Sequence, residues 1–509
     1  MIKNKNMKNI HFFKAIILVS TFLLTSCDEK LDTEQEYLAG SSIDYSSPEA
    51  AKGALIGAYS KFQVMGWHEI PLISVRGDDV NAGGLGDQAP FADTDNYIYD
   101  NNFWMYNSVW NSWYQKIVEI STQIEQLEKF REGGVNPALI NQYIAECKTL
   151  RSFTLLEISR VWGEVILMES LDQSQLKLKS KDEIMKWISG QMDESIPNLP
   201  DMRPNQRTDL KGGITRYTAL AIKAMANLEL KNYPEVANAT GIIINSGKFS
   251  LYPDYYNLFN IPGKLADENL FEIQYSDLGT ASGGEGKNHT WAFYGPSSWQ
   301  PKVLGASAGW GFYEPSLKYI KFMISRGEKT RLQTSVLFTN RGINKIKEDP
   351  NYATLPSWIS NTTPSGDVIN DYTRAMFASG KHYLPSDQLT PGRKAYGTNK
   401  NYIITRYAEI LLMYAEAVTR GAQPSAGSAD NAVNIVRQRA GLGILSNVTS
   451  DQVMNEKFAE LGMEWGIRYY DMVRLGKTDE LSYDGRTFVA DKQFLPYPLA
   501  QLEKINALK

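Results

Sequence analysis

The chain has 509 residues, of which 43% are hydrophobic, and a formal net charge of −4 at pH 7. This length allows a large hydrophobic core, and the acidic balance argues against nucleic acid as a partner. After the N-terminus, no run approaches the roughly 20 consecutive apolar residues of a membrane-spanning helix. Gly/Ser-rich or Pro-rich linkers are absent after about the first forty residues, so the sequence favours one large domain over several.

Residues 1–26 have the pattern of a secretory signal peptide. They carry four lysines and no acidic residue, so the remaining chain has a net charge of −8 against −4 for the whole. The apolar run from Ala15 to Leu24 is too short to span a membrane. It ends in Leu24-Thr-Ser-Cys27, which resembles the bacterial lipobox, where the cysteine becomes the lipid-bearing first residue. We therefore expect Cys27 to be acylated, for example with palmitate, residues 27–45 to form a tether, and residues 46–509 to form the domain.

Helical patterns begin near Ser47 and dominate the first half of the domain. The stretch from Trp67 to Asn107 is rich in glycine, asparagine and aromatic residues and is predicted as loop. Further helices are predicted from Val109, and then over 138–162, 181–196, 214–230 and from Asn232 to Gly247. The helix over 214–230 presents Ala219, Ala221, Ala224 and Ala226, and such small side chains let two helix axes approach closely. This arrangement resembles tetratricopeptide-type helix pairs.

The region from Tyr252 to Lys400 has a different pattern. Phe271 to Tyr275 alternates as a short strand, and residues 279–315 are rich in glycine, serine and aromatic residues. A helix is predicted over 316–325, and loops with short strands over the rest of the region. Cys147, in the helix over 138–162, is predicted to be a small core residue.

Residues 401–476 carry the most specific pattern in the chain. We predict a helix from Asn401, which contains Arg406-Tyr-Ala-Glu-Ile410 and Ala415-Glu-Ala417, and a second helix over 432–441, which ends in Val436-Arg-Gln-Arg-Ala-Gly441. A capping box at Thr449 opens a third, predicted to run to Gly476. Its polar positions are Glu456, Glu460, Glu464, Arg468, Asp471 and Arg474. In this order, the three helices resemble the SusD/RagB family of surface glycan-binding lipoproteins of Bacteroidetes.

The resemblance implies a fold and a function. The expected fold is mainly α, a single domain of tetratricopeptide-like helix pairs with long irregular loops and a few short strands. The expected function is capture of oligosaccharides at the cell surface and their delivery to a SusC-like TonB-dependent transporter. The protein would be anchored by lipid in the outer membrane and face the cell exterior. Asp28-Glu29 after the lipobox resembles the export signal for that location.

Catalytic and metal-binding patterns have little support. Glu456 and Glu460 lie four residues apart on one predicted helical face, but a solvated or ion-paired face explains them better than acid/base catalysis. No cofactor, metal site or catalytic residue is expected, although Asp93 and Asp95 leave calcium binding open. A surface glycoside hydrolase or lyase remains an alternative, because two carboxylates distant in sequence can meet in the fold.

Tryptophans in the predicted loops are the candidates for ligand binding. A flat aromatic ring covers the C–H face of a sugar, and neighbouring polar side chains bind its hydroxyl groups. The candidate glycan-binding residues are Trp104, Trp291, Tyr294, Trp299, Trp310, Arg76, Asn81 and Asn288. Trp110 and Trp113 share a helical face and are assigned to packing.

The sequence leaves the ligand class open. Basic residues in the predicted loops, among them Arg374 and Lys302, suit an anionic polymer such as ulvan, or are ordinary surface charge. A neutral glucan fits the tryptophans equally well. A RagB-like protein that binds oligopeptides is a further alternative, because tryptophan also binds peptides.

Overall fold

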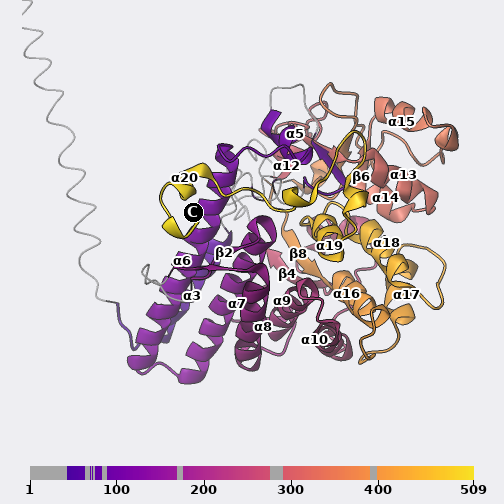
Figure 1. The fold of residues 1–509 in the computed structure, drawn as a ribbon. Coiled ribbons are helices and arrows are strands. Elements are labelled where there is room, and N and C mark those ends of the chain that lie inside the picture. The colour runs from indigo at the N-terminus through magenta and orange to yellow at the C-terminus, as the bar shows by residue number, and fades with distance from the viewer. Residues whose placement is uncertain are drawn as a thin grey trace, which may run out of the picture.

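The computed structural model describes residues 43–63, 69, 72, 75–82, 89–168, 176–275, 290–389 and 398–508, and it is mainly α-helical (Figure 1). Its α-helices are α3 (Pro48–Gln63), α5 (Ala89–Asp95), α6 (Trp104–Glu132), α7 (Pro137–Trp162), α8 (Lys181–Ser195), α9 (Arg216–Glu229), α10 (Tyr233–Asn245), α11 (Tyr255–Leu258), α12 (Thr290–Tyr294), α13 (Leu317–Ser325), α14 (Thr330–Ser335), α15 (Asn340–Lys347), α16 (Tyr407–Thr419), α17 (Ala429–Arg439), α18 (Ser450–Leu461), α19 (Ile467–Leu475) and α20 (Leu499–Leu502). The predicted fold class is confirmed.

Successive helices pack side by side across the lower half of the molecule (Figure 1). Each of α6, α7, α8 and α9 packs against the next helix in the chain, and α10 then contacts α16, which packs on α17 and α18. The small side chains predicted on α9 explain the close approach, because Ala219, Ala221, Ala224 and Ala226 are all buried. Asn136 caps α7 by accepting from Ala138 N–H, and Gly163 follows its last residue, which confirms the predicted helix over 138–162.

The strands form two-stranded antiparallel sheets. They are β1 (Val80–Ala82) with β5 (Tyr313–Pro315), β2 (Val165–Ile166) with β3 (Leu178–Lys179), β4 (Asn269–Ile273) with β8 (Tyr402–Arg406), and β6 (Val336–Phe338) with β7 (Phe377–Ser379). The helix predicted from Asn401 was wrong for residues 402–406, which pair as β8 with β4. The run Ile403-Ile404-Thr405 is β-branched, which favours a strand, and α16 begins only at Tyr407.

Two other predicted boundaries were wrong. The helix predicted over 449–476 is interrupted between α18 and α19, where Met463, Trp465 and Gly466 have positive φ angles of 68°, 44° and 68°. A side chain at Gly462 would approach the Tyr319 ring to 2.5 Å, so this turn requires glycine. The stretch predicted as loop up to Asn107 contains α5 and the first residues of α6.

A continuous hydrophobic core connects the helices to the irregular upper half. It includes Trp110 and Trp113, as predicted, and Cys147, which is fully buried on α7. Among the described residues, no helix combines the length and the apolar character needed to cross a bilayer. The predicted signal peptide, Cys27 and most of the predicted tether lie outside the described residues.

Candidate functional site

Trp104 is a large apolar side chain that the fold leaves exposed. It is the first residue of α6, and 57% of its surface is accessible. Its helix starts after a turn in which the Asp100 side chain accepts from Asn102 N–H at 2.9 Å. Trp104 therefore lies at the N-terminal end of α6, and this end of the helix points to the upper part of the molecule (Figure 1).

A row of ring contacts connects Trp104 with Trp310. The ring centroids are separated by 6.1 Å for Trp104 and Phe103, 6.0 Å for Phe103 and Phe91, 5.7 Å for Phe91 and Phe312, and 5.4 Å for Phe312 and Trp310. We call these five residues the aromatic row. The three phenylalanines are buried, and Trp310 is half-buried. The row therefore has an accessible tryptophan at each end and a rigid apolar base between them.

Short backbone contacts hold the Trp310 end of the aromatic row. Trp310 N–H donates to the carbonyl of Ala292 at 2.7 Å, and Phe312 N–H donates to the carbonyl of Phe293 at 2.9 Å. Gly311 between them has a φ of 68°, and a side chain there would approach the Tyr372 ring to 2.6 Å. The guanidinium of Arg374 lies 4.6 Å from the centre of the Phe312 ring. A cation thus lies over the phenylalanine that neighbours Trp310 in the aromatic row.

Three other aromatic candidates are buried beneath this surface. The rings of Trp291 and Trp299 lie 5.5 Å apart, edge to face, and the Trp291 indole N–H donates to the carbonyl of Ser307 at 3.1 Å. Tyr294 stacks on His382 with a ring separation of 4.0 Å. All three side chains are at least 94% buried. In this structure their rings support the upper loops from within and present no open face to solvent.

The polar candidates lie apart from the aromatic row or outside the described residues. Arg76 is fully buried and lies 4.4 Å from the centre of the Tyr469 ring, so its guanidinium is held by aromatic packing. Asn81 is half-buried on β1, and its side-chain oxygen accepts from Tyr483 at 2.5 Å. Asn288 lies outside the described residues. Phe91, Phe103 and Phe312 were not predicted to belong to the site, because nothing in their local sequence pattern shows that they meet.

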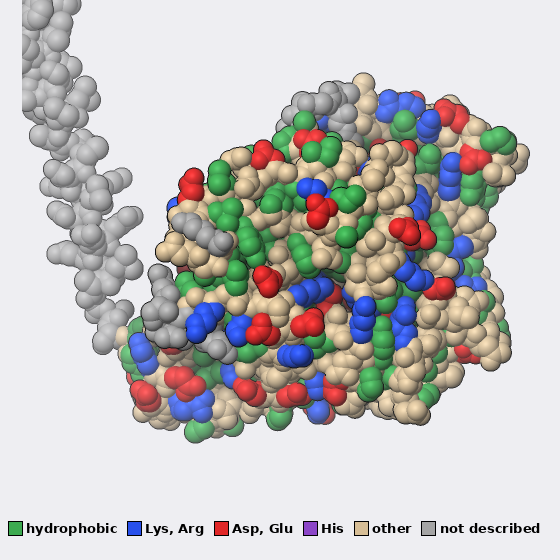
Figure 2. Space-filling model, viewed as in Figure 1, with side chains coloured by type: hydrophobic (Ala, Val, Ile, Leu, Met, Phe, Trp, Pro, Cys, Tyr) green, Lys and Arg blue, Asp and Glu red, His purple; other side chains and the backbone are tan. Residues whose placement is uncertain are grey.

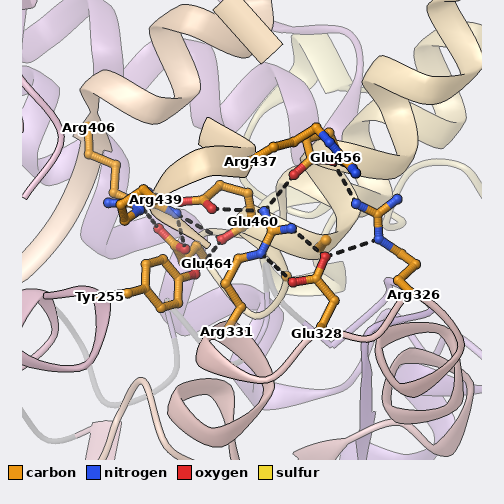
Figure 3. Close-up of polar contacts among 12 residues, drawn as sticks. Tyr255, Arg326, Glu328, Arg331, Arg406, Arg437, Arg439, Glu456, Glu460 and Glu464 are labelled. Carbon is orange, nitrogen blue, oxygen red and sulfur yellow. Dashed lines mark hydrogen bonds and ion pairs between the residues drawn. The ribbon is translucent and has the colours of Figure 1, made fainter. Parts of the chain in front are cut away.

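Glu456 and Glu460 belong to a buried network of ion pairs (Figure 3). Arg331 from α14 reaches both carboxylates, at 2.8 and 3.0 Å, and Glu460 also pairs with Arg406 and Arg439. Burial alone would raise the pKa of Glu460, but these guanidinium groups hold the pKa well below its ordinary value. Glu456 has a lowered pKa for the same reasons. Both groups are therefore ionised at neutral pH and neither can serve as a proton donor.

Asp95, one of the two aspartates weighed for calcium, has other partners. Asp95 is buried, and its carboxylate accepts from Ala82 N–H at 2.9 Å and pairs with Arg486. Burial raises the pKa of Asp95 to about 6, and the nearby Arg486 offsets part of this effect. Within the described ranges, no group of three or more histidine, cysteine, aspartate or glutamate side chains is arranged to hold a metal ion.

The protein is mainly α-helical, and its helices pack in pairs. The segments above them carry the aromatic row. The model of the SusD family matches residues 246–498. A SusD-like protein of Bacteroides ovatus is 24% identical over 90% of this chain and 82% of its own length. SusD-like protein P38 of Formosa agariphila is 24% identical over 94% of this chain and 93% of its own length. Over residues 246–498 the chain therefore matches the SusD family.

Solved structures have the same fold. Surface glycan-binding protein A from Bacteroides fluxus superposes with a TM-score of 0.75 and 23% identity, over 90% of this chain and 97% of that one. The protein of the same name from Bacteroides thetaiotaomicron, solved in complex with laminarihexaose, gives a TM-score of 0.74 and 23% identity, over 91% and 98% of the two chains.

Proposed function

We propose that this protein is a glycan-binding protein that captures oligosaccharides or polysaccharides on the surface around Trp104 and Trp310, without cleaving them. The observation that carries the proposal is the exposure of Trp104 at the end of the aromatic row. Leaving a side chain of this size in water forgoes about 1.5–3 kcal/mol of burial free energy. A ligand with an apolar face recovers that free energy when it covers the ring.

Sugars match this chemistry. A pyranose has a C–H face that stacks on an indole ring, and equatorial hydroxyl groups that need hydrogen-bond partners in the ring plane. The guanidinium of Arg374 lies over the Phe312 ring, which is next to Trp310 in the aromatic row. A solved relative in complex with laminarihexaose supports the choice of a glycan over other ligands.

The ion-pair network supports binding without hydrolysis. Glycoside hydrolysis needs one carboxylic acid that remains protonated at the working pH. Glu456 and Glu460 were the pair that the sequence offered for this role, and both have lowered pKa values. Their role in this proposal is to hold the helices together, with the ligand bound elsewhere.

We further propose that the protein is anchored in the outer membrane through lipid on Cys27 and faces the cell exterior. From there it would pass captured oligosaccharides to a SusC-like TonB-dependent transporter. The lipobox-like Leu24-Thr-Ser-Cys27 and the family assignment support this part of the proposal. Metabolic labelling with a palmitate analogue tests it, because label should enter the wild type and not Cys27→Ala.

Affinity electrophoresis tests glycan capture. The chain from Asp28, which keeps every described residue, is run through gels that contain laminarin, as a neutral polymer, or ulvan, as a polyanionic one. Retardation by one polymer, without release of shorter products, is the expected result. Ile56→Ala is the control for exposed apolar side chains, since Ile56 is 46% exposed on α3. If no polymer in a broad panel slows the protein and an oligopeptide library does, glycan capture is refuted.

A further inference from the structure

A groove runs beside α6, one to four turns after Trp104. It has a volume of about 250 Å³ and lies between α6, the end of β2 and the C-terminal segment with α20. Its lining includes Trp110, Asn111, Tyr114, Gln115, Ile166 and Gln501. On the face seen in Figure 2, charged side chains are denser across the lower helices than over the upper part of α6 and the neighbouring C-terminal segment.

The groove is continuous with the Trp104 surface because both use one face of the same helix. Asn111 and Gln115 follow Trp104 by seven and eleven residues, which at 3.6 residues per turn places each of them within about 20° of Trp104 around the helix axis. The rise of about 1.5 Å per residue separates them from Trp104 by about 10 and 16 Å along that axis. A ligand stacked on Trp104 that extends along α6 therefore enters the groove.

Two amide side chains in the groove have unused hydrogen-bonding capacity. Gln501 donates to the side-chain oxygens of Asn107 and Asn111, at 2.8 and 2.9 Å, and so fixes the orientation of Asn111. The Asn111 amide nitrogen remains available, and Gln115 makes no side-chain hydrogen bond to any described residue. Both residues are exposed. An amide offers a donor and an acceptor together, as a hydroxyl-rich ligand requires.

The residues that line the groove disfavour both charged ligands and purely apolar ligands. The rings of Trp110 and Tyr114 lie 4.7 Å apart and form an aromatic base, while Ile166, Met168 and Leu176 add apolar walls. Glu119 is the one carboxylate among the described lining residues, and Lys61 lies 3.4 Å from it. A lipid or an apolar helix would leave the amides unsatisfied, and a polyanion would find no cation in the lining.

We infer that this groove is a second glycan subsite, which binds the neutral continuation of a sugar chain whose other part is stacked on Trp104. The inference rests on the proposed function and adds to it a length requirement. Oligosaccharides that reach from Trp104 into the groove gain the hydrogen bonds of Asn111 and Gln115. Shorter oligosaccharides bind at Trp104 alone and gain nothing from those two residues.

The test compares disaccharide and hexasaccharide fractions of the polymer that retards the wild-type protein in the gel. Dissociation constants are measured by calorimetry for the wild type, for the double variant Asn111→Ala/Gln115→Ala, and for Trp104→Ala. Glu125→Ala is the matched control, because Glu125 is an exposed residue further along the same helix. All four substituted side chains are exposed, so the variants are expected to keep the wild-type melting temperature.

The double variant should bind the hexasaccharide about five- to tenfold more weakly than the wild type and bind the disaccharide unchanged, since a lost hydrogen bond of this kind is worth a few-fold in affinity. Trp104→Ala should weaken binding of both fractions. A double variant that binds the hexasaccharide like the wild type overturns the subsite and leaves the proposed function intact. If no polymer retards the wild-type protein in the gel, the proposed function itself is refuted.

Discussion

Arg468 on α19 donates to both carboxylate oxygens of Asp78, 390 positions earlier in the chain, at 2.6 and 3.0 Å. Both side chains are buried, and Lys318 adds a second cation 2.7 Å from the same carboxylate. The next residues after Asp78 lead into β1, which pairs with β5 directly after Phe312. The pair therefore connects the C-terminal helices to the segment that carries one end of the aromatic row.

Removal of this guanidinium should destabilise the fold. Arg468→Ala leaves the buried Asp78 carboxylate with one cation, and such a loss typically costs about 3–5 kcal/mol. Urea unfolding at pH 7 measures the free energy of unfolding of the variant and of the wild type. Arg216→Ala is the control, because Arg216 and Asp201 form an exposed pair, which is worth about 0–1 kcal/mol. Equal stability of the two variants would show that the Asp78 pair is not important for the fold.

Glu460→Gln should reduce stability without affecting any hydrolytic activity. Three arginines hold the pKa of Glu460 below its unfolded value, so its contribution is present above pH about 4.3 and is lost as the pH falls further. At pH 7 the variant should unfold more easily than the wild type by several kcal/mol, and the difference should shrink under acid conditions. Polysaccharide cleavage by the wild type that the variant lacks would instead identify Glu460 as catalytic.

The effect of Glu314→Gln on stability should depend on pH in the direction opposite to that of Glu460→Gln. Burial raises the pKa of Glu314 to about 7, although its carboxylate accepts from Met376 and Phe377 N–H groups at 2.8 and 2.9 Å. Because the folded pKa lies above the unfolded value, the stability that Glu314 contributes below pH about 4.3 is lost as the pH rises to about 7. The variant keeps one acceptor oxygen. Between pH 4 and pH 8, the free energy of unfolding of the variant should rise by about 1–3 kcal/mol relative to that of the wild type. If the two unfolding free energies differ by the same amount across this pH range, the pKa of Glu314 is not raised.

Trp291→Ala should lower the stability of the fold and leave ligand binding unchanged. Its ring is 4% exposed and packs against Trp299 and Tyr383, so truncation leaves a cavity that typically costs about 3–5 kcal/mol. We expect a lowered melting temperature, with ligand affinity preserved where the variant remains folded. If Trp291→Ala keeps the melting temperature and loses the ligand, the loop around Trp291 opens to expose this ring.

The sequence was sufficient to predict the helices that have a regular apolar face and clear ends. The helix over 138–162 is an example, with Asn136 before it and Gly163 after it. Prediction failed where tertiary contacts decide the local structure. Residues 402–406 share the apolar pattern of the following helix, but their pairing with β4 makes them a strand. The turn at Met463 to Gly466 likewise depends on the packing of Tyr319 against Gly462.

The tryptophans show the same limit for the candidate site. Trp104 and Trp291 both lie in segments that looked like loops, yet one is 57% exposed and the other 4% exposed. Their local sequences do not distinguish them, because exposure depends on what the rest of the chain places above each ring. Phe91, Phe103 and Phe312 come from three separate segments, so only the folded chain reveals that they connect Trp104 with Trp310.

The most direct test of the account is the affinity of Trp104→Ala for the polymer that retards the wild type, measured by titration beside Ile56→Ala. Both substitutions remove an exposed apolar side chain from a helix, so both variants should keep the wild-type melting temperature. We predict that Trp104→Ala binds at least tenfold more weakly, because covering an indole ring contributes about 1.5–3 kcal/mol, and that Ile56→Ala binds like the wild type. Unchanged affinity of Trp104→Ala would contradict the proposal that this surface captures glycan.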